Sequence, residues 1–295
     1  MKKKFVIATR GSRLALRQSE IVKELLLERF PGLIIEFLEV TTKGDIDQTT
    51  PLSSFGNTGV FVKGLERKLL SGEADLAVHS LKDVPADSNP ELLLASFPQR
   101  EDVRDVLVTS NGKSLKDLKT GSIIGTSSPG RQEQLKLLRP DLDFKSIRGN
   151  VDTRIKKVQN GEYDATILAA AGLKRLGYSI QPANYFTLND IVPSPGQGAL
   201  VIHVHRKNSE IIEMVRQIND DRIEKQVNAE RRFMQIIGGG CRYPVAAHAE
   251  ILGDKVIFRA VAYKPDFKKI KKMEKETSLD NLLEVAENTA KKMLA

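Results

Sequence analysis

The sequence contains a single cysteine, Cys241, and three glycines, residues 238–240, stand directly before it. Because glycine has no side chain, this stretch lets another group come close to the sulfur. Arg242 follows and favours the thiolate if its side chain turns toward the sulfur, and the thiolate is the nucleophile that forms thioethers or acyl intermediates. The alternative is an inert, buried thiol beside a flexible turn. One cysteine cannot form an internal disulfide or a cysteine-rich zinc site.

A second candidate lies in Ser80-Leu81-Lys82-Asp83, which follows a predicted strand over residues 75–79. Open α/β sheets contact their ligands outside the carboxyl ends of the strands. At such a place Asp83, with Lys82 beside it, is suited to general acid or base catalysis with a tuned pKa. The local alternative is a helix N-cap or a turn aspartate.

Arginines recur where predicted strands give way to helices. They are Arg10, Arg131, Arg148, Arg154 and Arg175. A guanidinium binds a carboxylate through two hydrogen bonds, so several of them around one cleft predict a ligand with many carboxylates. Taken singly, each arginine also fits a surface ion pair.

The turn Thr126-Ser127-Ser128, just before Arg131, combines hydroxyl groups with the start of a predicted helix. Backbone N–H groups at such a turn are suited to binding an anion. Ordinary helix capping explains the two serines equally well.

The four histidines do not predict a metal site. His203 and His205 share one face of a predicted strand, but no third ligand stands near them in the sequence. We therefore expect no bound metal.

Composition narrows the class of protein. The chain has 295 residues and a net charge of +8, which suits either a nucleic-acid or membrane surface or a site for a small polyanion. The lysine-rich run at residues 264–275 has almost no aromatic residues for base stacking, which favours a solvated loop or strand edge and no nucleic-acid partner. The short apolar run after Met1 fits neither a signal peptide nor a membrane span, so we expect a cytoplasmic protein without membrane contact.

Short apolar strands alternate with helical patterns over the first two thirds of the chain, which indicates an α/β protein with largely parallel pairing. The predicted strands are residues 5–9, 34–40, 75–79, 122–125, 144–147 and 164–169. A hinge at residues 193–196 precedes a strand at 199–205 that could rejoin the first sheet. From residue 222 onward, a helix, two strands and a final helix at 278–294 predict a small α+β domain. The polar stretch 44–59 is expected to be a mobile lid or a disordered surface loop.

Taken together, these segments resemble the porphobilinogen deaminase family, also called hydroxymethylbilane synthases, over nearly the whole chain. The matching segments are Ile7-Ala8-Thr9-Arg10-Gly11-Ser12, residues 77–85, Arg100-Glu101-Asp102 with Arg104-Asp105, residues 125–128, 148–154, 163–165, 168–173 and 196–199, and Gly239-Gly240-Cys241. Their order and spacing are kept throughout, which makes the resemblance specific.

The resemblance implies two lobes like those of periplasmic binding proteins and a small α+β C-terminal domain. The implied boundaries are 1–98 plus 199–217, 104–192 and 221–295, with the lid at 44–59. The implied reaction joins four porphobilinogen units head to tail on a dipyrromethane cofactor, releases ammonia, and hydrolyses off hydroxymethylbilane. We expect porphobilinogen as the small-molecule substrate and a monomer.

The resemblance also assigns roles. A thioether would join the dipyrromethane to Cys241, and Asp83 would be the catalytic acid and base. The implied cofactor- and substrate-binding residues are Arg10, Ser12, Ser80, Lys82, Thr126, Ser127, Ser128, Arg131, Arg148, Arg154, Arg175 and Gln197.

The chain departs from the family pattern at several positions. Gly130 stands where the family has one of two adjacent cofactor-binding arginines, with Pro129 before it in place of leucine; Thr58, Val103 and Ser194 are further departures. The alternative function is a non-catalytic, two-lobed protein of the same fold that binds small anions.

Overall fold

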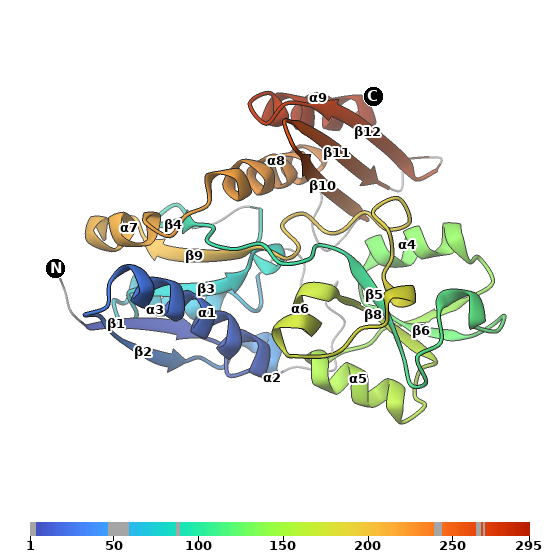
Figure 1. The fold of residues 1–295 in the computed structure, drawn as a ribbon, viewed down its shortest axis with the longest axis horizontal. Helices are drawn as coiled ribbons and strands as arrows, with labels where there is room; N and C mark the ends of the chain where they lie inside the picture. Colours follow the sequence, from blue (N-terminus) through green and yellow to red (C-terminus); the bar gives the residue numbers. More distant parts are fainter. Residues whose placement is uncertain (1–3, 47–58, 87–88, 239–243, 264–266, 268) are drawn as a thin grey trace. The chain divides into compact units, whose positions relative to one another are not determined.

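A computed structural model describes residues 4–46, 59–86, 89–238, 244–263, 267 and 269–295 (Figure 1). The described residues form two compact units, one from residues 4–46, 59–101 and 198–224 and the other from residues 102–197 and 225–295. Each unit therefore joins segments that are far apart in the sequence.

The first unit is built on a five-stranded sheet with the strand order β2-β1-β3-β9-β4. Its strands are β1 (Lys4–Thr9), β2 (Ile34–Glu39), β3 (Leu76–Ser80), β4 (Leu92–Ser96) and β9 (Leu200–His205). Strand β1 pairs in parallel with β2 and β3, whereas β9 runs antiparallel to both β3 and β4. The predicted return of the chain to the first sheet at residues 199–205 is confirmed.

Helices cover both faces of this sheet, because the residues of β1 alternate between the two faces. The helices of the unit are α1 (Arg13–Arg29), α2 (Lys43–Ile46), α3 (Lys63–Leu70) and α7 (Ser209–Arg216), with a 3₁₀ turn at Leu81–Asp83. Phe5 and Ile7 pack in one apolar core with α1 and α7, while Ala8 packs in a second core with α3. Burying each large apolar side chain stabilises the folded unit by about 2 kcal/mol. This packing holds the strands in place, and the polar residues described below follow the ends of these strands.

The second unit contains a four-stranded sheet with the order β5-β8-β6-β7. Its strands are β5 (Asp105–Thr109), β6 (Ile123–Gly125), β7 (Asp143–Lys145) and β8 (Ala165–Ala169). Its helices are α4 (Pro129–Leu138), α5 (Val151–Gln159) and α6 (Ala170–Arg175), with 3₁₀ turns at Leu115–Asp117 and Pro182–Asn184. Strand β6 is parallel to β7 and β8, and β5 is antiparallel to β8.

The second unit also contains a three-stranded antiparallel sheet, β10-β11-β12. Its elements are α8 (Asp221–Ile237), β10 (Val245–Leu252), β11 (Lys255–Ala262), β12 (Lys271–Thr277) and α9 (Leu282–Leu294). Phe233 of α8 and Phe258 of β11 lie in one core with α9, which runs along the sheet (Figure 1). The α+β prediction is confirmed, but the sheet has three strands where two were predicted; the additional one, β12, is an edge strand that contains part of the lysine-rich run.

The prediction of largely parallel pairing holds for two of the three strand pairs in the second sheet, but for only two of the four in the first, because one strand is reversed in each sheet. The reversed strands are β5 and β9. The chain passes from the first sheet to the second at β5, and returns to the first sheet at β9. A parallel partner requires a crossover within the same sheet, and these two strands have none. Within the described residues, no helix is long and apolar enough to cross a membrane.

Candidate active site

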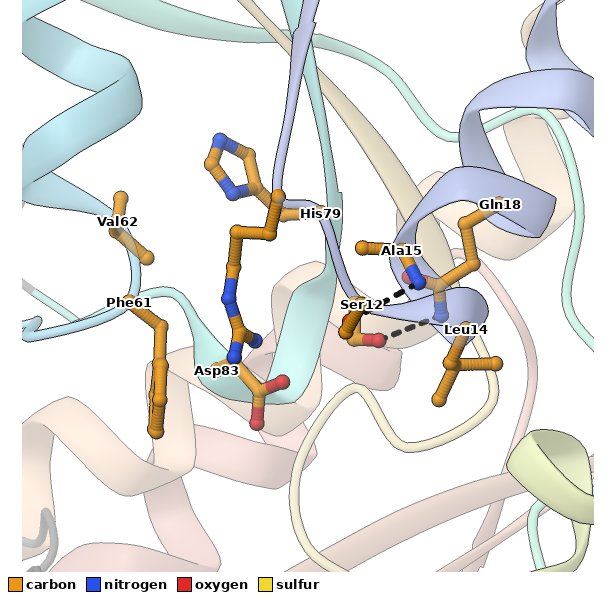
Figure 2. Close-up of a pocket in the computed structure, with 10 residues that line it drawn as sticks. Ser12, Leu14, Ala15, Gln18, Phe61, Val62, His79 and Asp83 are labelled. Carbon is orange, nitrogen blue, oxygen red and sulfur yellow. Dashed lines mark hydrogen bonds between the residues drawn. The ribbon is translucent and has the colours of Figure 1, made fainter. Parts of the chain in front are cut away.

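Three neighbouring parallel strands of the first sheet, β2, β1 and β3, end at the same edge. The segments that follow them carry Asp45, Arg10 and Asp83, so the fold brings together residues that the sequence separates. A small cavity of about 60 Å³ lies at this edge (Figure 2). Its lining residues are Arg10, Ser12, Leu14, Ala15, Gln18, Phe61, Val62, His79, Ser80 and Asp83.

Asp83 lies on the 3₁₀ turn that follows β3, and its side chain is exposed. Figure 2 shows its carboxylate between Phe61 on one side and Ser12 on the other. Within the described part of the chain, no hydrogen bond or ion pair occupies this carboxylate, so it caps no helix there. A carboxylate without a structural partner, beside a cavity, is available for proton transfer.

Arg10 follows β1 and is the cation of this cavity. Its Nε donates to both carboxylate oxygens of Asp45 at 3.2 Å, and its Nη2 also donates to Asp45. Partial burial acts to raise the pKa of Asp45, but the hydrogen bonds from Arg10 and Thr42 outweigh it and lower the pKa. Arg10 and Asp45 therefore form a permanent ion pair at neutral pH.

The hydroxyl groups of the cavity are oriented by the protein. Ser12 is the N-cap of α1 and accepts a hydrogen bond from the Ala15 N–H at 3.4 Å. Ser80 accepts one from Gln18 Nε2 at 2.7 Å, and both bonds are drawn in Figure 2. Because each oxygen already accepts, each hydroxyl hydrogen remains to be donated, which suits an anionic ligand.

Two histidines lie behind this edge. His79 and His203 are buried, with ring centroids 5.6 Å apart. Burial lowers the pKa of His79 to about 3, and His203 and Arg10 act in the same direction. His79 is therefore neutral at physiological pH. No group of three or more His, Cys, Asp or Glu side chains among the described residues could hold a metal ion.

We expect the buried His79 to make the fold sensitive to acid. The pKa of His79 is about 3 in the folded protein, whereas its ordinary value, which applies to the unfolded chain, is 6.5. Between these two pH values the unfolded chain therefore binds a proton that the folded chain does not. Acidification then lowers the stability by up to about 1.4 kcal/mol per pH unit. His79→Leu should remove this contribution, and thermal unfolding from about pH 7 to pH 4 measures it. Equal slopes of Tm against pH in both proteins would contradict the prediction.

The second sheet repeats the arrangement of the first. Strands β8, β6 and β7 are parallel neighbours, and the segments after them carry the remaining predicted residues. Ser128 is the N-cap of α4 and accepts from the Arg131 N–H at 3.3 Å. Ser127 Oγ accepts from the Ile147 N–H at 3.1 Å, and Thr126 is buried. Ser128 therefore caps the helix, as the alternative interpretation predicted, and Ser127 ties the end of β6 to the segment after β7.

Arg131 is held inside a buried network. Its Nε and Nη2 donate to the two carboxylate oxygens of Asp105 at 2.9 and 2.7 Å, and Nη1 donates to the Ile167 carbonyl at 3.1 Å. Gln197 accepts from Arg131 at 3.2 Å and donates to Asp105 at 2.7 Å. Asp105 is 1% exposed. One edge of the Arg131 guanidinium is thus taken by a carboxylate of the protein, and Gln197 belongs to the same network.

The other three predicted arginines follow the neighbouring strands. Arg148 is buried after β7, Arg154 lies on α5 with its Nε donating to the Gly149 carbonyl at 2.8 Å, and Arg175 ends α6 after β8. Gly149 has a φ of 109°, and a Cβ there would lie 2.6 Å from Thr153, so glycine is required between Arg148 and the cap of α5. Three cations therefore lie in the segments that follow these strands, at the edge where α4 begins.

Cys241, Thr58 and residues 47–57 of the predicted lid lie outside the described residues, whereas residues 44–46 belong to α2. The start of α4 nevertheless lies close to the start of β10, because a Cβ on Gly130 would lie 3.8 Å from the Val245 carbonyl oxygen. Val245 follows Cys241 by four residues. Position 130 thus lies beside Val245, the first residue of β10.

Asp45, Phe61 and Asp105 were not predicted as site residues. Asp105 stands in the quoted Arg104-Asp105 pair, which gave no role for it, and Asp45 follows the predicted strand at 34–40. The signal that could have identified Asp45 and Asp105 is an acidic residue close to the end of a strand, at the same edge of the sheet as the arginines.

In the first unit, the end of the parallel strands thus combines an arginine, two serine hydroxyl groups and, among the described residues, an unpaired carboxylate suited to proton transfer. Comparison with known proteins agrees. The family model "Porphobilinogen deaminase, dipyromethane cofactor binding domain" matches residues 5–213, and "Porphobilinogen deaminase, C-terminal domain" matches residues 225–295. The chain is 42% identical over 292 residues to the porphobilinogen deaminase of Bordetella parapertussis, covering 99% of this chain and 93% of that protein. It is 43% identical over 267 residues to a probable porphobilinogen deaminase of Hyperthermus butylicus, covering 89% and 87%.

The chain belongs to the porphobilinogen deaminase family. It is a transferase of tetrapyrrole biosynthesis, and its dipyrromethane cofactor-binding domain spans residues 5–213. Among solved structures, it is also similar to the methionine-binding protein MetQ, with 10% identity, a TM-score of 0.47 and coverage of 78% of this chain and 95% of that one. Nothing about a ligand of this chain follows from a similarity of that size.

Proposed function

We propose that the protein joins four porphobilinogen units head to tail on a dipyrromethane bound by a thioether to Cys241, and then hydrolyses off hydroxymethylbilane. The observation that carries this proposal is the unoccupied carboxylate of Asp83 beside the Arg10 cavity. The reaction needs an acid that protonates the leaving amino group of porphobilinogen and an anion that stabilises the azafulvenium cation formed when ammonia leaves. A single carboxylate serves both needs in turn.

The proposed chemistry also fits the cations. Every pyrrole ring carries an acetate and a propionate, and Arg10, Ser12, Ser80 and Lys82 of the first unit supply donors for the incoming ring. In the second unit, Thr126, Arg148, Arg154 and Arg175 supply donors for the bound rings, and Arg131 and Gln197 shape their edge of the site. The first turn of α4 contains no acidic residue that would repel an anion. When bound, the dipyrromethane supplies the pyrrole carbon to which the next unit is joined.

We further infer three domains, residues 1–98 plus 199–217, 104–192 and 221–295, in line with the three sheets. We also infer a cytoplasmic monomer without a nucleic-acid partner, and the charges of the third sheet support the last of these points. Lys255 pairs with Glu276 at 2.6 Å, and Arg259 pairs with Glu274 at 2.8 Å. Acidic residues thus interrupt the basic surface there, and DNA binding favours a continuous basic one.

The proposed function is tested with the purified chain and porphobilinogen. We expect uroporphyrin after oxidation of the product, an intact mass above that of the bare polypeptide, and a pink colour with Ehrlich's aldehyde reagent. A chain that binds porphobilinogen but releases neither ammonia nor tetrapyrrole would instead be the non-catalytic anion-binding protein.

Asp83→Asn is expected to reduce turnover by a factor of about 10² or more, because the amide neither donates the proton nor opposes the cation. Since no described residue bonds to the Asp83 carboxylate, Tm should stay unchanged. Initial rates of uroporphyrin formation and a thermal melt measure both quantities. Near-normal turnover would reduce Asp83 to a residue of the turn.

Cys241→Ser is expected to give a folded protein whose mass equals that of the bare polypeptide, because a hydroxyl group is a far weaker nucleophile than a thiolate. Intact-mass measurement and a circular dichroism spectrum are sufficient. A dipyrromethane still attached to the variant would place the anchor at another residue.

Gly130→Arg is expected to increase the fraction of chains that carry dipyrromethane. Pro129 occupies the first position of α4, where its fixed φ suits a helix, so it needs no change. A Cβ at position 130 meets only ordinary contacts, the nearest at 3.8 Å. Gly130→Gln is the matched control for helix propensity without charge, and intact mass is the measurement. An equal gain in both variants would assign the effect to the helix rather than to the charge.

A further inference from the structure

Two neighbours restrain the guanidinium of Arg10. Asp45 occupies the edge formed by Nε and Nη2. The ring of Phe61 covers a face, with its centroid 4.2 Å from Arg10 Cζ. Flexible side chains lose rotamer freedom when they bind a ligand, and these two contacts remove that freedom beforehand.

The carboxylate of Asp45 is itself fixed. Its Oδ2 accepts from the Thr42 N–H at 3.1 Å and from the Thr42 hydroxyl at 2.6 Å. These bonds belong to the turn that begins α2, so a ligand would have to break the turn in order to displace Asp45. The geometry therefore favours a permanent anchor over a carboxylate that exchanges with the ligand.

Phe61 is fixed by the same turn. A Cβ on Gly44 would lie 2.3 Å from the Phe61 ring, so the ring packs directly on the backbone beside Asp45. Gly44, Asp45 and Phe61 are one packed cluster around Arg10.

The side of Arg10 opposite Asp45 is left for the ligand. Within the described residues, Nη1 donates no hydrogen bond, and Arg10 lines the cavity with Ser12 and Asp83. The cavity has a volume of about 60 Å³, and its polar lining suits a carboxylate group of the ligand.

We propose that Asp45 and Phe61 are positioning residues, which hold Arg10 so that its Nη1 side receives one ring carboxylate of the incoming porphobilinogen next to Asp83. This role rests on the proposed function. It acts on binding of the substrate, because the contacts of both side chains are with Arg10.

Asp45→Asn tests the role, since the amide keeps an oxygen for Thr42 but loses the ion pair. We expect KM for porphobilinogen to rise about tenfold, with kcat changed by less than about twofold, because a misplaced binding group costs affinity. The matched control is Asp141→Asn. Asp141 pairs with Arg139 through bonds of 2.7 Å and also accepts from a threonine hydroxyl at 3.0 Å. It precedes β7, whereas Arg10 and Asp45 follow β1 and β2. The two ion pairs are similarly exposed, 22% and 25% for Arg10 and Asp45 against 21% and 31% for Arg139 and Asp141.

Phe61→Leu supplies a second variant in case Asp45→Asn does not fold, because leucine retains an apolar contact but has no ring face for the cation. It should raise KM in the same direction by about threefold. An unchanged KM in the folded variants, a loss of kcat alone, or an equal rise in Asp141→Asn would overturn the role.

The Arg10 Nε–H signal in a ¹⁵N NMR spectrum gives a readout that is independent of turnover, and its absence in Arg10→Lys identifies it. It should exchange slowly with water in the wild type and in Asp141→Asn, and rapidly in Asp45→Asn. An unchanged signal in Asp45→Asn overturns the positioning role even if the wild type forms no uroporphyrin. A wild type that forms no uroporphyrin overturns only the proposed function.

Discussion

A guanidinium held along one edge by a carboxylate of the protein is the interaction on which both α/β sheets of the site depend. Arg10 is held by Asp45 after β1, and Arg131 by Asp105 at the start of β5. A cation taken out of water is costly unless it is paired, so the carboxylate stabilises each of these arginines in its partly buried position. The pairing also fixes where the remaining donors point. In the first sheet the free side faces the Asp83 cavity, whereas the more buried Arg131, whose side chain is 11% exposed, acts as a tie between α4 and β5.

The strands that precede the candidate site residues could be predicted from the sequence, but the residues that pair across those strands could not. Strand periodicity and the positions of Arg10, Asp83 and Arg148 were sufficient to predict a polyanion site at strand ends. The partner of Arg10 could not be predicted, because Asp45 is 35 residues away and meets it only through the sheet order β2-β1-β3. Strand β4 was missed. Its pairing partner β9 is more than 100 residues later in the sequence, after all the strands of the second sheet. The hydroxyl groups of Ser127 and Ser128 fitted both a ligand and the backbone, and only coordinates separate the two.

A buried carboxylate organises the third sheet as well. Glu230 of α8 is fully buried and accepts hydrogen bonds from the Gly196 N–H at 2.8 Å and the Ala249 N–H at 2.9 Å, with His248 Nδ1 at 3.1 Å. Three partners offset the cost of removing a carboxylate from water. The segment that leads to β9, predicted as a hinge, is thereby tied to α8 and β10. Because Gln197 of the same segment bonds to Asp105, the segment connects the network around Arg131 with the sheet that follows Cys241.

Because position 130 is glycine instead of arginine, the start of α4 offers few hydrogen-bond donors and little positive charge to an anion. Pro129 has no N–H group, Ser128 Oγ accepts the Arg131 N–H, and Asp105 neutralises the Arg131 side chain. Among the described atoms of this first turn, the Gly130 N–H is the donor that no hydrogen bond uses. One backbone N–H with the dipole of a ten-residue helix attracts an anion less strongly than a guanidinium does. If the cofactor binds as proposed, the positive charge opposite its carboxylates would therefore come mainly from Arg148, Arg154 and Arg175, which follow β7 and β8.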